Sequence, residues 1–171
     1  QPIAPLPLNA EHVALIKRAL HGVTQEGTST RVFMGAPYSS GGKTGTAQAI
    51  GIKQNEKYNA SKMAEQQRDH SLYIAFAPLE APTIAMAVIV ENAGFGAEAA
   101  APISRRVFDY WIAGLWPSDE DMAATQLGKA SAPIGKPRAP VFDVFARAEF
   151  GVRSPNPAVV SIGARVLLDV L

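Results

Sequence analysis

The ten-residue stretch SSGGKTGTAQ (residues 39–48) sets two glycines before a run in which small and hydroxylated residues alternate. Successive side chains of a strand point to opposite faces of a sheet. The stretch therefore predicts a strand over residues 43–52, which Gly41-Gly42 enters by a tight turn. Its two faces would carry Thr44, Thr46 and Gln48 on one side and Lys43, Gly45 and Ala47 on the other.

Lys43-Thr44-Gly45-Thr46 gathers one ammonium and two hydroxyls within four residues, a compact set of donors for a carboxylate. Gly45 lets a ligand approach the backbone closely, and the N–H of Thr46 would point at a developing oxyanion. We therefore take Lys43 and Thr46 as candidate catalytic residues, and Thr44, Gly45 and Thr46 as candidate substrate-binding residues. The alternative is a polar strand start with no ligand.

A phosphate-binding loop is excluded by the residue at position 37. The pattern G-x-x-x-x-G-K-[ST] requires a glycine there, and this chain has Pro37. Metal binding is not expected either, because the chain has no cysteine and no clustered carboxylates, and His12 and His21 lack a third ligand.

The remaining patterns predict an α+β fold, an antiparallel sheet flanked by helices. Asn9 is a good N-cap for an amphipathic helix over residues 10–22, whose apolar positions are Val13, Ile16, Leu20 and Val23. The other predicted elements are an extended piece over 31–35, a short helix over 60–67, a hairpin of strands 71–76 and 83–90, and an apolar helix over 98–115. On this last helix Ile103, Val107, Tyr110, Trp111 and Leu115 form one stripe, and Phe108, Tyr110, Trp111 and Trp116 would pack on the sheet.

The composition is that of a globular protein, with 171 residues, 47% hydrophobic residues and 18% charged residues. A net charge of +1 gives no field that favours nucleic acid. No run of about 18 apolar residues is present. The proline-punctuated start, QPIAPLP, is typical of mid-protein chain rather than of an export signal.

Residues 35–78 read GAPYSSGGKTGTAQAIGIKQNEKYNASKMAEQQRDHSLYIAFAP. This stretch resembles the penicillin-binding protein 2 family, class B D,D-transpeptidases of the rod-shape elongation machinery. The segments that carry the resemblance are GKTGTAQ, KYNASKMAE, RDH and AFAP, and it continues through VENAG towards Trp116. We therefore assign residues 1–116 to the C-terminal part of a transpeptidase domain.

The resemblance implies a serine acyl-enzyme that cross-links peptidoglycan stem peptides and binds β-lactam antibiotics. In the family, K-T-G follows two earlier motifs, S-x-x-K with the nucleophile and S-x-N. Ser40-Gly41-Gly42-Lys43 fits the first pattern, but Gly-Gly is a poor helix former. Ser154-Pro155-Asn156 fits the second, but it lies far downstream. We reject both, so the nucleophile is expected in another part of the protein, and this chain alone is expected to be inactive.

The resemblance also implies partners and a location: the remaining N-terminal part of the transpeptidase, elongation-machinery membrane proteins, and the periplasmic side of the bacterial inner membrane. No cofactor is expected. The alternative is a non-catalytic fragment that only binds carboxylate-ended peptides or associates as a strand-exchanged dimer. A serine β-lactamase or carboxypeptidase shares K-T-G but fits the rest of the stretch less well.

Outside the motif we expect structural roles. Asp69 would fix a turn before His70, Tyr58 and Asn59 would lie in a loop, and Glu91 to Gly94 would form a turn. Residues 117–140 are rich in Ala, Pro, Ser and Gly, which predicts a flexible or extended linker. Residues 141–171 regain hydrophobicity and stay unassigned.

Overall fold

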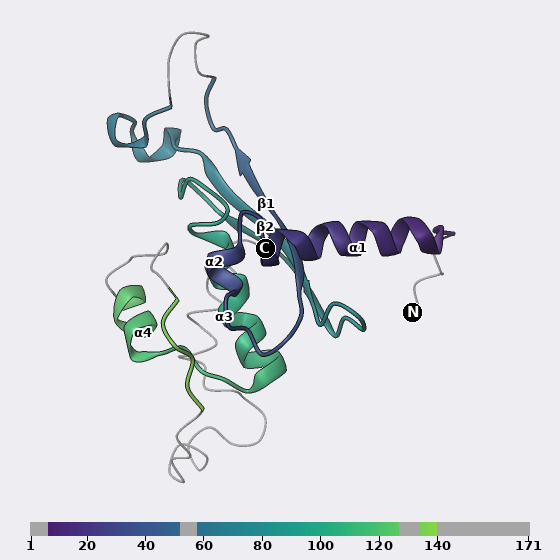
Figure 1. The fold of residues 1–171 in the computed structure, drawn as a ribbon. Helices are drawn as coiled ribbons and strands as arrows, with labels where there is room; N and C mark the ends of the chain where they lie inside the picture. Colours follow the sequence, from purple (N-terminus) through teal and green to yellow (C-terminus); the bar gives the residue numbers. More distant parts are fainter. Residues whose placement is uncertain (1–6, 52–57, 127–133, 140–171) are drawn as a thin grey trace, which may run out of the picture.

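The computed structural model describes residues 7–51, 58–126 and 134–139. Three strands form an antiparallel sheet in the order β1-β2-β3: β1 (Gly41–Ala47), β2 (His70–Ala77) and β3 (Ile84–Val90). The helices around it are α1 (Ala10–Gln25), α2 (Thr30–Phe33), α3 (Ala100–Ala113) and α4 (Asp119–Gln126) (Figure 1). This confirms the predicted α+β fold and the predicted hairpin. The predicted bounds of the first strand are wrong, because β1 includes Gly41 and Gly42, where a tight turn was predicted, and ends at Ala47 rather than at residue 52.

The core lies between one face of the sheet and the helices α2 and α3. Tyr73, Ala75 and Ala77 point to this face from β2 and are at most 5% exposed. Phe33 of α2 stacks on Tyr73 with ring centroids 6.0 Å apart, and it contacts Phe108 of α3 at 6.3 Å. Small alanines at the start of α3 bring this helix close to the strands.

Helix α1 begins at the predicted N-cap, since the Asn9 side chain accepts hydrogen bonds from the N–H groups of Glu11 and His12. It runs three residues beyond the predicted end. Figure 1 shows α1 extending away from the sheet, so that only its C-terminal end meets β1. Two residues of its predicted apolar stripe, Val13 and Ile16, are therefore exposed to 36% and 58%.

The prediction of an extended piece over 31–35 is wrong, because Thr30–Phe33 form the single helical turn α2. Arg105 of α3 explains the difference. Its Nη1 donates to the carbonyl oxygens of Val32 and Met34 at 2.9 and 3.1 Å. These carbonyls end the helical turn, and an arginine some 70 residues further along the chain satisfies them.

The predicted apolar stripe of the last long helix is wrong at Tyr110 and Trp111, although Ile103 packs against the core. The residues that α3 buries include Ser104, Arg105, Phe108 and Asp109, whereas Tyr110 is 37% and Trp111 61% exposed. A charged arginine and aspartate lie inward because they neutralise each other, which a hydrophobicity pattern does not register. Phe108 alone of the predicted aromatic set is fully buried.

Two further segments differ from the prediction. In place of one helix over 60–67 there are two separate 3₁₀ turns, η1 (Ala60–Lys62) and η2 (Glu65–Gln67). The predicted extended linker contains the helix α4, and Arg138 then pairs with Trp116 as an isolated antiparallel bridge. Among the described residues no helix has the length and apolarity that a membrane span requires. Residues 141–171 lie outside the described part.

Candidate functional site

Strand β1 carries the predicted site residues at an edge of the sheet, with β2 as its only neighbouring strand in the described part of the chain. The register pairs Lys43 with Ile74, Thr44 with Tyr73 and Thr46 with Ser71. Paired residues in an antiparallel sheet point to the same face. Lys43 therefore lies on the face opposite α3, and both threonines lie on the α3 face, as the alternation predicted.

The Lys43 side chain is exposed. Its Nζ donates to the backbone carbonyl of Thr44 at 2.8 Å. This short-range bond to its own strand leaves the other two ammonium hydrogens for a ligand or for another side chain. Lys43 thus has the exposure that its predicted role requires.

The two threonines differ in their surroundings. Thr44 is half-buried, and its hydroxyl shares a hydrogen bond of 2.9 Å with the hydroxyl of Thr28, just beyond α1. Thr46 is exposed, and no residue within the described ranges hydrogen-bonds to its hydroxyl. Of the pair, Thr46 is therefore the one that is ready to bind a ligand at the strand edge, while Thr44 already has a partner.

The sheet face that Lys43 shares is apolar and partly exposed. It is formed by Leu72, Ile74 and Phe76 of β2 with Ala85, Ala87 and Ile89 of β3. Ile74 is 54% and Ile89 40% exposed, although both are in the interior of strands. A contiguous apolar sheet face of this kind is typical of an interaction surface. We refer to these six residues as the open face.

A loop after β3 closes over the other face of the site strand. A Cβ on Gly96 would lie 2.7 Å from the carbonyl oxygen and 3.0 Å from the nitrogen of Gly45, and closer still to the carbonyl oxygen of Leu72. The Ser71 hydroxyl donates to the Phe95 carbonyl at 2.9 Å and accepts from the Ala100 N–H at 3.1 Å. Only a glycine fits against the strand at this position.

Sequence reasoning treated VENAG as simple turn chemistry and did not assign Ser71 or Gly96 to the site. The second glycine of the sequence GFG (residues 94–96) was a signal, since glycine outside a tight turn often marks close backbone approach. Which backbone it approaches depends on contacts more than 20 residues away in the sequence. The sequence alone does not specify those contacts.

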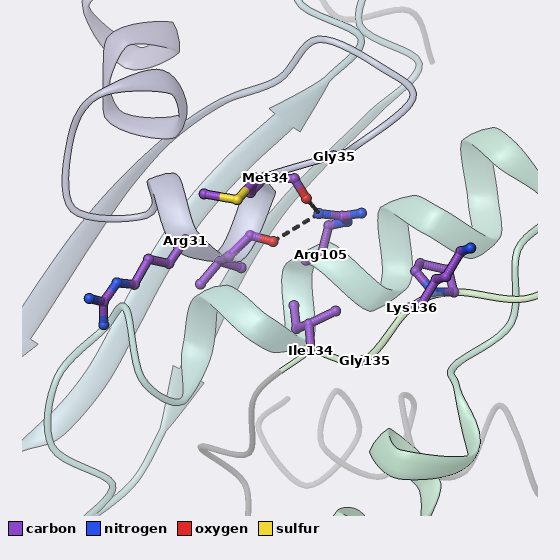
Figure 2. Close-up of a pocket in the computed structure, with 9 residues that line it drawn as sticks. Arg31, Met34, Gly35, Arg105, Ile134, Gly135 and Lys136 are labelled. Carbon is purple, nitrogen blue, oxygen red and sulfur yellow. Dashed lines mark hydrogen bonds between the residues drawn. The ribbon is translucent and has the colours of Figure 1, made fainter.

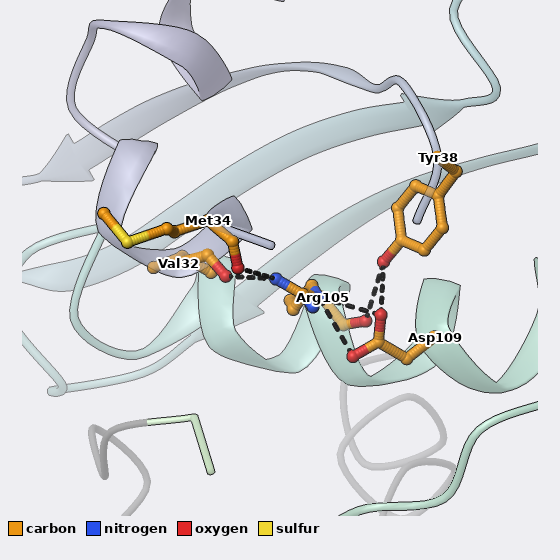
Figure 3. Close-up of polar contacts among 5 residues, drawn as sticks. All are labelled: Val32, Met34, Tyr38, Arg105 and Asp109. Atoms are coloured by element: carbon orange, nitrogen blue, oxygen red, sulfur yellow. Dashed lines mark hydrogen bonds and ion pairs between the residues drawn. The ribbon is translucent and has the colours of Figure 1, made fainter. Parts of the chain in front are cut away.

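The segment that leads into β1 is fixed at three successive residues. The Tyr38 hydroxyl donates to Asp109 Oδ1 at 2.8 Å, as Figure 3 shows. The Ser39 hydroxyl donates to Glu80 Oε2 at 2.8 Å, and this bond lowers the pKa of the Glu80 carboxyl. The Ser40 carbonyl accepts from His21 Nδ1 and from the Thr24 hydroxyl.

These contacts explain why Ser40 is no nucleophile. Ser40 is 2% exposed, and it lies directly before the strand β1 rather than at the start of a helix. The S-x-x-K arrangement with Lys43 is thus rejected on geometry as well as on sequence. The second pattern, Ser154 to Asn156, falls outside the described residues.

Burial shifts two phenols near the site strand. Burial raises the pKa of Tyr73 to about 12, although its hydrogen bond with the Ser29 hydroxyl acts in the opposite direction. Burial also raises the pKa of Tyr38 far above its ordinary value, and the adjacent Asp109 carboxylate adds to this shift. Both phenols therefore stay neutral, and neither is placed to exchange protons with a ligand at β1.

A separate cavity of about 240 Å³ lies between α2, Arg105 and residues 134–137. Figure 2 shows that the Arg31 and Lys136 side chains at its border point in different directions, and Arg105 is occupied by its carbonyl partners. No residue of β1 lines this cavity. In the described part of the chain no group of three acidic, histidine or cysteine side chains has the geometry of a metal site.

The family model for the penicillin binding protein transpeptidase domain matches residues 1–109. The peptidoglycan D,D-transpeptidase MrdA of Escherichia coli K12 is 44% identical over 102 residues, which are 58% of this chain and 16% of that protein. A crystal structure of Pseudomonas aeruginosa PBP2 in complex with WCK 5153 is 30% identical with a TM-score of 0.50, over 65% of this chain and 22% of that one.

The fold of a second solved structure is similar as well. PBP2 of Helicobacter pylori, in a complex with MreC, is 24% identical with a TM-score of 0.52 and covers 67% of this chain and 20% of that one. The chain thus spans about one sixth of the length of the E. coli relative and about one fifth of the solved chains. What these comparisons identify is a part of a larger protein of this kind.

Proposed function

The chain belongs to the penicillin binding protein transpeptidase domain family, and from this membership we propose that it supplies the K-T-G strand of a peptidoglycan D,D-transpeptidase. The reaction would join stem peptides through a serine ester, and β-lactams would acylate the same serine. The nucleophile would come from the N-terminal part of the transpeptidase. The observation that carries the proposal is an exposed Lys43 beside a partly exposed apolar face.

The open face supports the proposed supply of the nucleophile from another segment. Ile74 and Ile89 together with the exposed start of α1 present apolar side chains that a stable protein covers. Because Lys43 shares the face of Ile74, any segment that packs there comes next to the ammonium. The N-terminal part of the transpeptidase would thus cover the apolar surface and bring a serine to Lys43 in one packing arrangement.

Within this site each residue of the motif would have its own role. Lys43 would stabilise the serine–lysine network electrostatically, and the exposed Thr46 hydroxyl would bind the substrate carboxylate, with the Thr46 N–H as an oxyanion donor. Thr44 would also bind substrate, from a half-buried position in which its hydroxyl is bonded to that of Thr28. The free edge of β1 would accept the substrate peptide as an added strand.

The setting follows from the same membership. We propose a location on the periplasmic side of the bacterial inner membrane and partners from the elongation machinery. The H. pylori PBP2 that shares this fold forms a complex with MreC, which supports a partner of that kind. No cofactor is required by the proposed reaction.

The test is covalent labelling with a fluorescent penicillin. The full-length natural protein that contains this chain is expected to take up label, and Lys43→Ala is expected to lower its second-order acylation rate by about 100-fold or more, the loss typical of a removed electrostatic donor. Lys62→Ala is the matched control, because Lys62 is an exposed lysine in η1. Equal rates for the two variants would contradict the assigned role of Lys43.

The same open face and free strand edge also favour a second candidate, a non-catalytic fragment that binds carboxylate-ended peptides or forms a strand-exchanged dimer. The two candidates differ in the bond that they form with penicillin. A full-length protein that binds penicillin only reversibly, with a doubled mass in sedimentation, would favour the fragment hypothesis and contradict the transpeptidase.

A further inference from the structure

His70 and His21 each form a hydrogen bond through Nδ1, but His70 accepts through this atom and His21 donates through it. The N–H of Asn92 lies 3.0 Å from His70 Nδ1. A backbone N–H can only donate, so Nδ1 of His70 must be unprotonated in this bond. The Nδ1 of His21 instead lies 2.8 Å from the Ser40 carbonyl, which can only accept. The bond of His21 therefore survives when the ring becomes charged, and the bond of His70 does not.

The bond from Asn92 holds the start of the loop that covers the site strand. Asn92 has a left-handed backbone with a φ of 57° and begins the path to Gly96. The next anchor is the Gly94 N–H, which donates to the Asp69 carbonyl at 2.9 Å. Gly96 then rests against the backbone of Gly45. The loop of residues 92–96 is thus fixed from His70 to the middle of β1.

Two acceptors beside His70 have no partner. Asp69 Oδ1 and Asn92 Oδ1 are buried and without a hydrogen bond among the described residues. A protonated Nδ1 needs an acceptor, and these oxygens belong to the residue before His70 and to the residue that it already contacts. A protonated Nδ1 cannot accept from the Asn92 N–H, so this bond is lost when the His70 ring becomes charged.

The titratable groups around His70 come from three segments. Arg68 and Asp69 precede β2, Tyr58 accepts from the Asp69 N–H at 3.0 Å, and Glu91 follows β3. From β1 the residue opposite His70 is the uncharged Ala47.

We propose that neutral His70 is a positioning residue that holds the 92–96 loop against the site strand, and that protonation of His70 releases this loop. Only the effect on catalysis rests on the proposed function: a released loop would leave Gly45 and Thr46 less firmly placed for the reaction. The release of the loop itself requires no assumption about the reaction.

The test compares the wild type with His70→Asn in the full-length natural protein. The asparagine side chain offers an oxygen in place of Nδ1 but has no proton to gain between pH 5 and 8. Hydrogen exchange of peptides that cover residues 91–97 is measured at about pH 7.5 and pH 5 and expressed as protection factors. The wild type is expected to lose about tenfold in protection at the lower pH, and His70→Asn is expected to lose none.

His21→Asn is the matched control and is expected to behave as the wild type does, because His21 donates through Nδ1. A wild type whose loop keeps its protection at pH 5, or a His70→Asn variant that loses it equally, would overturn the proposal. The pH profile of penicillin acylation is measured in parallel. If no variant is acylated while the exchange behaves as expected, the proposed function fails and the inference on His70 stands.

Discussion

Arg105 and Asp109 form an ion pair one helical turn apart on α3, with Nε 2.8 Å from Oδ1 and side chains only 3% and 4% exposed. Figure 3 shows that the pair joins two other segments, because Arg105 binds the carbonyls of α2 and Asp109 accepts from Tyr38. This cluster fixes the chain that leads into the site strand. The cluster satisfies the buried Arg105 charge, and each of its members holds more than one partner. Removing one side chain of the cluster therefore breaks several contacts at once.

Asp109→Ala is expected to destabilise the protein by about 3–5 kcal/mol, because Arg105 would stay buried without its counter-charge. The control is Asp119→Ala, which removes a pair with Arg138 whose side chains are 86% and 46% exposed. An exposed pair of this kind is worth at most about 1 kcal/mol. Urea denaturation of both variants measures the difference, and equal midpoints would contradict the role of the buried pair.

Gly96→Ala is expected to weaken folding by about 1–3 kcal/mol, since the new methyl group would overlap the backbone of Gly45 and Leu72. The backbone cannot move aside as a flexible side chain would. Gly51→Ala is the matched control, because nothing lies within 4 Å of a Cβ at that position. Thermal denaturation measures the stability of both variants. An unchanged melting temperature for Gly96→Ala would show that the loop is not in close contact with the backbone of β1.

Phe108→Ala is expected to lower the free energy of unfolding by about 3–5 kcal/mol, the loss typical of removing a fully buried aromatic side chain from a protein core. Trp111→Ala, three residues further on the same helix, is expected to change stability by less than about 0.5 kcal/mol, because Trp111 is 61% exposed. The two substitutions distinguish the observed face of α3 from the predicted apolar stripe. A larger loss for Trp111→Ala would restore that prediction.

Stability is expected to fall in strong alkali because the pKa of Tyr73 is raised from 10.0 to about 12. In this range the folded protein holds a proton that the unfolded chain has lost, so the stabilisation is complete below pH 10 and disappears as pH rises towards 12. The slope that Tyr73 alone contributes is at most about 1.4 kcal/mol per pH unit. Urea midpoints on both sides of this range measure the loss.

Tyr73→Phe is the comparison for this alkaline loss. It removes the titrating phenol together with its bond to Ser29, so it is expected to be less stable at neutral pH by about 1 kcal/mol but to decline less steeply in alkali. Tyr38 keeps its own raised pKa in this variant and contributes a residual decline. An identical slope for both proteins would show that Tyr73 is not the group responsible.

Local patterns in the sequence predicted most elements correctly. The two hairpin strands, the N-cap Asn9 and the alternation along SSGGKTGTAQ depend on residues close to one another in the chain. The failures are those segments whose conformation a distant residue decides. The turn α2 is helical because Arg105 binds its last carbonyls, and α3 turns Arg105 and Asp109 inward because they neutralise each other.

By itself the sequence determined that a lysine and two threonines alternate along one strand, since a period of two is a property of the extended backbone. It also determined the family, because the K-T-G context is continuous in the chain. Only the tertiary structure decided that the open face lies beside Lys43 and that Gly96 closes over Gly45. These relationships join residues far apart in the chain, and their energies arise from packing and desolvation, which exist only after the strands have paired.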